Sequence, residues 1–177
     1  MSTPDPGPEG TRARILAVAT DQVRRFGRSR LSIVHLARAA GMTHANVYRY
    51  FPSKSALAEE VGAQWVRGLE QRLAEITQAP DPAYDKLERF LTLLARAYED
   101  KARNDPEIFA LLAESGVSAL ERHERRIRDL LGRIVEEGAA ARAFAISDAR
   151  RSEQAILDTM HRFIDVTAVQ QAVRRDP

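Results

Sequence analysis

The chain of 177 residues is long enough for one large or two small domains. Hydrophobic residues make up 44% and charged residues 29%, a composition typical of a soluble globular protein, and no apolar run approaches the ~20 residues that cross a bilayer. The absence of cysteine excludes disulfides, thiolate zinc sites and a cysteine nucleophile, and together with a start that lacks the features of a secretory signal it predicts a cytoplasmic protein.

Net positive charge is concentrated in the N-terminal part of the chain. Residues 11–72 hold eleven Arg and Lys against four Asp and Glu, a net charge of +7, whereas residues 73–177 hold sixteen against nineteen, a net charge of −3. This asymmetry favours a polyanion-binding module joined to a second, mildly acidic part. A basic surface that is simply solvated is the alternative that charge alone leaves open.

The chain is expected to begin with a disordered tail over residues 1–10, which hold three prolines and two glycines. A first domain is predicted over residues 11–57. Its first helix has apolar residues at helical spacing from Thr11 onward and ends at Gly27, as a C-cap glycine would end it.

Three hydroxyl residues are suited to cap the helices that follow. These are Ser32, Thr43 and Ser53, before helices expected over residues 32–40, 44–50 and 54–78. The last of these helices is long, and it connects the first domain to the second, residues 79–177.

The second domain is also expected to be helical. Asp81-Pro82 and Asp105-Pro106 each place a cap residue before a first-turn proline, which is a helix start signal. Periodic apolar residues predict another helix ending near Gly138 and one last helix from Asp148 past Thr167. A third Asp-Pro pair, at 176–177, suggests that a further helix begins there and is missing, a frayed terminus being the alternative. No strand-length alternation competes, so the fold class is all-α.

The stretch GMTHANVYRYFPSKSAL, residues 41–57, holds three aromatic residues within four positions, although only 6% of the chain is aromatic. Two helices joined by a tight turn at Gly41 fit a helix-turn-helix. On the second helix Val47 and Phe51 lie four apart and can face inward. The opposite side of this helix then carries His44, Ala45, Tyr48 and Arg49. Such a polar, exposed face suits the major groove of DNA.

Three further residues are interpreted as phosphate ligands. The hydroxyls of Tyr48 and Tyr50 are expected to point outward to phosphate oxygens, the alternative being that both rings pack on the long helix. Lys54 begins that helix, where unpaired N–H groups already favour an anion, so a bound phosphate would explain a lysine in the first turn.

The segment LSIVHLARAAGMTHANVYRYFPSKSAL, residues 31–57, resembles the signature of the tetracycline-repressor-like (TetR) family of bacterial transcriptional regulators. The resemblance covers roughly residues 11–57. It implies that operator DNA is contacted by Ser32, Thr43, His44, Ala45, Asn46, Tyr48, Arg49, Tyr50 and Lys54. Ala45 departs from the glycine frequent at its position, and its methyl group can meet a thymine methyl.

The resemblance also implies a homodimer formed through the last helices, a small-molecule effector in the C-terminal domain, and release from a palindromic operator. The chain is therefore expected to be a sequence-specific regulator, most simply a repressor. A largely nonspecific architectural DNA-binding protein is the alternative, which the hydrogen-bonding residues of the short helix disfavour. No P-loop, nucleotide-binding glycine fingerprint, HExxH or triad is found, so neither an enzyme nor a cofactor is expected.

Candidates for the effector pocket lie on apolar faces of the second domain. They are Phe90, Leu94, Tyr98, Phe109, His123, Met160, His161, Phe163 and Asp165. For the apolar members, plain core is the alternative. His123 lies on an apolar stripe, and His161 and Asp165 lie four apart on one helix face. These polar groups either enter a pocket, as effector or metal ligands, or they have structural roles. In the second case His161 and Asp165 form a helical ion pair, and His123 is hydrogen-bonded or partly exposed.

Overall fold

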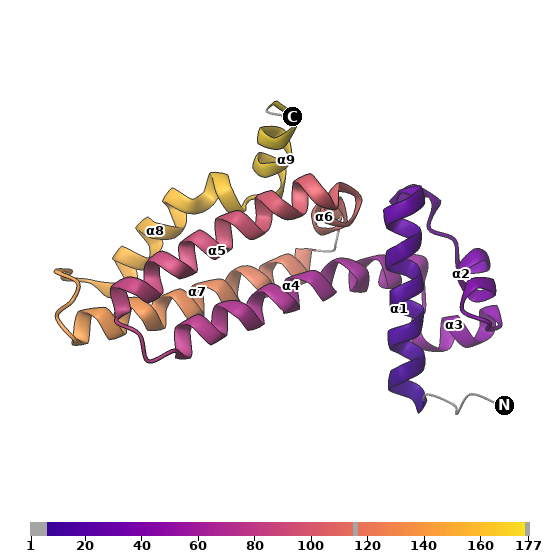
Figure 1. Ribbon diagram of the computed structural model, residues 1–177, viewed down its shortest axis with the longest axis horizontal. Helices are drawn as coiled ribbons and strands as arrows, with labels where there is room; N and C mark the ends of the chain where they lie inside the picture. Colours follow the sequence, from indigo (N-terminus) through magenta and orange to yellow (C-terminus); the bar gives the residue numbers. More distant parts are fainter. Residues whose placement is uncertain (1–6, 115–116, 176–177) are drawn as a thin grey trace.

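The structure, a computed structural model, describes residues 7–114 and 117–175. Over these residues the chain forms nine α-helices, one short 3-10 helix and no strand, which confirms the predicted all-α class. A compact head built from the first helices lies at one end, and the long helix α4 runs from it into an elongated bundle (Figure 1). No described helix has both the length and the hydropathy that a membrane crossing needs.

The helices divide between the head and the C-terminal bundle. The head contains α1 (Gly7–Phe26), η1 (Arg28–Arg30), α2 (Ile33–Ala39) and α3 (His44–Tyr50). The bundle contains α4 (Lys54–Gln78), α5 (Ala83–Asn104), α6 (Pro106–Glu114), α7 (Val117–Ala140), α8 (Ala149–Ile164) and α9 (Val166–Arg175).

The predicted caps account for where the head helices begin. The hydroxyl of Ser32 accepts a hydrogen bond from the His35 amide at 3.5 Å, and that of Thr43 accepts one from the Asn46 amide at 3.2 Å. Ser53 caps α4 in the same way at 3.0 Å. Each bond satisfies one of the N–H groups that the first helical turn leaves unpaired, so all three predicted helix starts are confirmed.

Three predictions about helix ends need correction. Asp81 does not cap α5, because this helix begins at Ala83, has Pro82 at its N-cap and has no side-chain cap bond. Helix α1 begins at Gly7, so residues 7–10 of the expected tail are helical, and Pro8 lies in the first turn, where its missing N–H costs nothing. The single last helix is in fact two, because the chain breaks at Asp165 and its carboxylate accepts the Ala168 amide at 2.7 Å as the cap of α9. Residues 1–6 and the Asp176-Pro177 pair lie outside the described residues.

The buried apolar residues form two separate cores, and α6 contributes to both. Ile108 and Leu111 pack into the core of the head, among residues of α1–α4. Phe109 and Leu112, on the other side of the same helix, pack into the core of the bundle. All four side chains are at least 96% buried. Helix α6 is therefore a shared wall between the two parts of the molecule.

Candidate DNA-binding face and effector site

The turn between α2 and α3 is held from three directions. Gly41 has a φ of 62°, a left-handed conformation that glycine adopts without strain. The Met42 amide donates to the Ala37 carbonyl at 2.8 Å, which closes the C-terminus of α2. From α1, the Arg14 guanidinium donates to the Ala40 carbonyl. The angle between the two helices is thus fixed by backbone geometry and by a side chain of a third helix.

Helix α3 has one buried and one exposed side, as its spacing predicts. Val47 is completely buried and Phe51, just past the helix, is 2% exposed, with the Arg12 guanidinium 5.0 Å from its ring centroid. The exposed residues are Thr43, His44, Ala45, Tyr48 and Arg49. Tyr48 keeps 49% of its surface accessible, which leaves its hydroxyl available to a phosphate.

Tyr50 does not share the orientation expected of it. Its ring is half-buried against the core of the head. Arg49 covers this ring at 5.1 Å from the centroid and donates to its hydroxyl at 3.1 Å. The ring of Tyr50 therefore packs on the head, whereas the side chain of Tyr48 is exposed. Asn46 is half-buried at the side of the exposed face.

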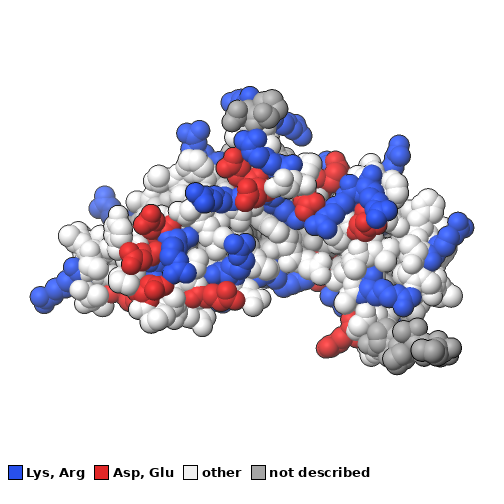
Figure 2. All heavy atoms as spheres, viewed as in Figure 1, with Lys and Arg blue, Asp and Glu red and all other residues white. Residues whose placement is uncertain are grey.

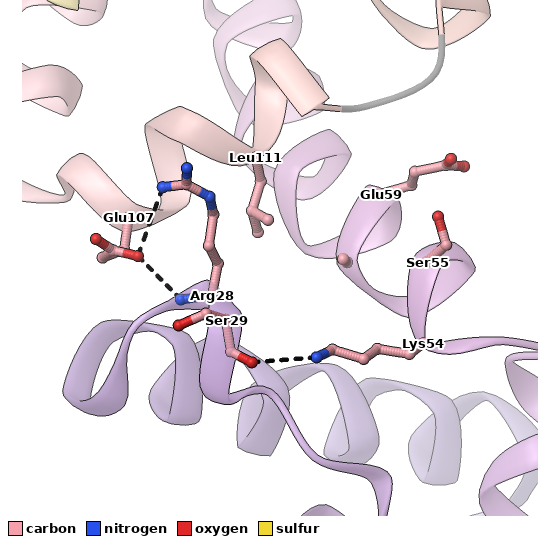
Figure 3. Close-up of a pocket in the computed structure, with 8 residues that line it drawn as sticks. Arg28, Ser29, Lys54, Ser55, Glu59, Glu107 and Leu111 are labelled. Atoms are coloured by element: carbon pink, nitrogen blue, oxygen red, sulfur yellow. Dashed lines mark hydrogen bonds and ion pairs between the residues drawn. The ribbon is translucent and has the colours of Figure 1, made fainter.

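Lys54 joins the start of α4 to η1 of the head (Figure 3). Its ammonium group at the start of α4 donates to the carbonyl of Ser29 in η1, at 3.3 Å. The side chain is exposed, so it can still meet a phosphate, but its position is set by η1, an element that the sequence did not predict. Figure 2 shows basic side chains over both the head and the bundle, and most of the visible acidic ones over the bundle, which agrees with the net charges of the two parts of the sequence.

Polar contacts tie the head to α6, and sequence reasoning missed them. Glu107 accepts the Arg28 amide at 2.9 Å and lies 3.8 Å from the Arg28 guanidinium (Figure 3). Beside it, Arg24 of α1 donates two hydrogen bonds of 2.9 Å to the carboxylate of Asp105. These partners are about 80 residues apart in the chain, so no local spacing could have paired them.

The Asp105 carboxylate also accepts a hydrogen bond from Lys101 at 2.6 Å. Burial by itself raises the pKa of Asp105, but the hydrogen bonds from Arg24 and Lys101 outweigh it and hold the pKa below its ordinary value. The group is therefore a carboxylate at neutral pH, and it links α1, the end of α5 and the start of α6.

The predicted effector residues separate into three groups. Phe90, Leu94 and Phe109 are completely buried in the bundle core, which favours the plain-core alternative for them. Met160 is half-buried on α8, and Phe163 on the same helix is 46% exposed. The remaining four residues, Tyr98, His123, His161 and Asp165, line two different pockets.

Tyr98, His161 and Asp165 line one side of a pocket of about 450 Å³ between α5, α7 and α8. The ion pair expected between His161 and Asp165 does not appear among the contacts of the described residues, because Asp165 ends α8 and instead caps α9. Burial raises the pKa of the Tyr98 phenol far above its ordinary value, so the hydroxyl stays neutral.

His123 lines a smaller pocket of about 270 Å³ between α4, α6 and α7. The ring is only 1% exposed, and its Nδ1 lies 2.7 Å from a carboxylate oxygen of Glu70. One ring face stacks on Tyr98 at 6.2 Å between centroids. Nε2 is buried and has no hydrogen-bond partner within the described part of the chain. His123 is thus hydrogen-bonded, as the alternative to a pocket ligand expects, but only through one of its two ring nitrogens.

A helix-turn-helix head with an exposed, polar second helix, joined to a second helical domain, is typical of a DNA-binding regulator. Comparison with protein families agrees. The model for bacterial regulatory proteins of the tetR family matches residues 15–61, and that for the tetracyclin repressor-like C-terminal domain matches residues 83–176. The chain belongs to the TetR family of transcriptional regulators. No curated protein matches its sequence.

Solved structures of this family share the fold over nearly the whole chain. A TetR/AcrR-family regulator from Thermobifida fusca has a TM-score of 0.70 at 19% identity, over 93% of this chain and 94% of that one. PfmR from Thermus thermophilus has a TM-score of 0.57 at 22% identity, over 92% and 94%. RolR in complex with its ligand resorcinol has a TM-score of 0.63 at 18% identity, over 95% and 81%.

Proposed function

We propose that the protein is a repressor that binds a palindromic operator as a homodimer and leaves it when a small molecule binds the C-terminal domain. Base edges are contacted from the first turn of α3, by Thr43, His44 and Ala45, and also by Asn46 and Arg49. Phosphates are held by Tyr48 and Lys54, with Ser32 and Tyr50 at the edge of the contact. The exposure of this face and the charge of the head support the assignment.

The observation that carries the release mechanism is the double role of α6. Leu112 forms part of the wall of the 270 Å³ pocket, while its neighbour Leu111 is buried in the core of the head. A ligand that displaces Leu112 therefore acts on the same rigid helix that Glu107 and Asp105 tie to η1 and α1. Such a ligand binds one orientation of the head better than the other, and this difference in affinity shifts the population away from the DNA-binding form.

The surface of α8 supports the homodimer. None of its residues is fully buried, although the helix is amphipathic and carries Ile156, Met160 and Phe163 at helical spacing. Ile156 and Met160 are half-buried and Phe163 is exposed, so the stripe is only partly covered within one chain, as is typical of a protein interface. Two copies joined there present two α3 helices to one face of the duplex, which matches a palindrome with half-sites a helical turn or a multiple apart, about 34–36 Å per turn.

A nonspecific architectural role is the second candidate, and it is not favoured. A protein that binds the backbone alone needs mostly Lys and Arg at the contact, whereas the exposed residues of α3 are Thr43 at its cap, His44, Ala45, Tyr48 and Arg49. These groups suit hydrogen bonds and methyl contacts with base edges.

The proposal is tested in two stages. The purified protein selects binding sites from a pool of random duplexes, and the selected sequence is then placed over a constitutive promoter that drives a reporter. We expect an inverted repeat to be selected, and expression of the protein to lower the reporter signal. Selection of no consensus would support the architectural role, and a raised signal would show an activator.

A further inference from the structure

The pocket around His123 differs from the rest of the bundle in its chemistry. Its walls include the apolar side chains of Val66, Leu112 and Leu120. His123 and Glu70 line it as well, hydrogen-bonded to each other. At about 270 Å³ it offers the room of about nine waters at ~30 Å³ each, so it accepts a ligand with on the order of ten non-hydrogen atoms.

The buried imidazole determines one feature of that ligand. A carboxylate only accepts hydrogen bonds, so the proton between His123 and Glu70 belongs to Nδ1. In the neutral ring Nε2 is then an acceptor, and it has no partner among the described residues although it is buried. A buried acceptor without a donor is costly, and a ligand hydroxyl would satisfy it.

Three arginines determine the other feature. Arg67, Arg122 and Arg126 line the same pocket, against the single carboxylate of Glu70. Arg67 is paired with Glu60 at 2.7 Å, whereas no ion pair of Arg122 or Arg126 occurs within the described part of the chain. The two unpaired guanidinium groups lie one turn apart on α7, and guanidinium groups are suited to hold a carboxylate.

We propose that this pocket binds a small carboxylate with an apolar body and a hydroxyl group, a class for which 4-hydroxybenzoate is the simplest probe. The hydroxyl donates to Nε2 of His123, the ring lies against Leu112 and its neighbours, and the carboxylate meets Arg122 and Arg126. The ligand class deepens the proposed function, because it rests on an effector acting through the C-terminal domain.

The pocket that Tyr98 and His161 line is not suited to such an anion. Its lining includes three carboxylates, those of Glu124, Asp158 and Asp165, and one arginine, Arg128. Three carboxylates in one small space repel a fourth. Of these two pockets, the anion therefore prefers the one that borders α6.

Isothermal titration with three probes tests the ligand class. 4-Hydroxybenzoate carries both features, and each of the other two probes lacks one. Benzoate lacks the hydroxyl, and 4-hydroxybenzamide lacks the charge. We expect 4-hydroxybenzoate to bind, and each of the other two to bind about tenfold more weakly, the effect of one hydrogen bond or more. No binding of 4-hydroxybenzoate, or equal affinity for the acid and the amide, would overturn the proposal.

Variants locate the binding. Arg122→Gln with Arg126→Gln should lower the affinity for 4-hydroxybenzoate at least tenfold and that for the amide much less. Arg125→Gln is the matched control, because Arg125 lies on the same helix, is paired with Glu121 and does not line the pocket. An equal loss in the control would place the anion elsewhere and refute the assignment.

The contact with His123 has its own readout. His123→Phe keeps an aromatic ring but removes Nε2, so it should weaken 4-hydroxybenzoate and leave benzoate unchanged, as in a double-mutant cycle. If this variant does not fold, the Arg122→Gln with Arg126→Gln variant still tests whether the ligand binds in this pocket. Operator release is measured separately by fluorescence anisotropy. If 4-hydroxybenzoate binds but does not release the protein from its operator, the ligand class is upheld and the release mechanism is refuted. If the protein represses but binds none of the probes, the ligand class alone is refuted.

Discussion

Leu111→Ala and Leu112→Ala form a matched pair of substitutions that tests whether α6 is a wall shared by two cores. The residues are neighbours of the same type, 3% and 4% exposed, but Leu111 belongs to the core of the head and Leu112 to that of the bundle. Removing a buried leucine side chain costs about 2–5 kcal/mol. Each of these two leucines borders a pocket, so the surrounding side chains have room to relax around the space that the substitution leaves. We therefore expect each substitution to lower the free energy of unfolding by about 2–3 kcal/mol.

Native-state hydrogen exchange with mass spectrometry locates the loss. We expect Leu111→Ala to lower the protection of α1–α3 by about 30- to 160-fold, and Leu112→Ala to lower that of α5 and α7 by a similar factor, the equivalents of 2–3 kcal/mol. If both variants loosened the same helices by the same factor, the two cores would not be energetically separate, and the reasoning about α6 would be refuted.

Three further predictions concern the head, the junction and the bundle. Lys54→Ala should weaken binding to all DNA sequences alike and reduce the salt dependence of the affinity. Arg49→Ala should instead relax the preference at one base position, at a cost of about 1–3 kcal/mol in binding free energy. Binding-site selection with each variant tests this, and a changed base preference in Lys54→Ala but not in Arg49→Ala would reverse the two roles. Folding lowers the pKa of Asp105. Its ion pairs therefore stabilise the folded state fully at a pH above the pKa of the unfolded chain, about 3.9. This stabilisation is lost as the pH falls through the lower pKa of the folded state. The difference in unfolding free energy between wild type and Asp105→Asn should therefore be largest near pH 7 and shrink below about pH 4; urea titrations that gave a constant difference would contradict this. Gly138→Ala places a methyl group where it would overlap the Phe144 ring, and it should lower the free energy of unfolding by about 1–3 kcal/mol in thermal unfolding, but by little in a Phe144→Ala background; an equal cost in both backgrounds would rule out the clash.

The parts of the fold that follow local rules were predictable from the sequence. Hydroxyl caps fixed the starts of α2, α3 and α4, and the four-residue spacing of Val47 and Phe51 gave the buried side of α3. The break at Asp165 escaped prediction because the apolar spacing continues across it, and only the cap of α9 reveals it. Helix η1 has no fully buried residue and hence no periodic signal.

The parts of the site that depend on distant partners were not predictable. Nothing near His123 in the sequence indicates Glu70, which is 53 residues away, nor does anything near Arg28 indicate Glu107. The orientation of Tyr50 likewise depends on its contact with Arg49, a neighbour whose side chain can equally extend into solvent. Three-dimensional pairing decides whether such a group is a DNA ligand, a structural contact or part of a pocket.

The central claim is that this protein recognises a particular DNA sequence with a pair of α3 helices. The most direct test is a fluorescence anisotropy titration of the selected operator and of a scrambled duplex of equal length, in the same salt. We expect two protomers per operator and an affinity at least about 10³-fold higher than for the scrambled duplex. Equal affinity for the two duplexes, or one protomer per operator, would contradict the account.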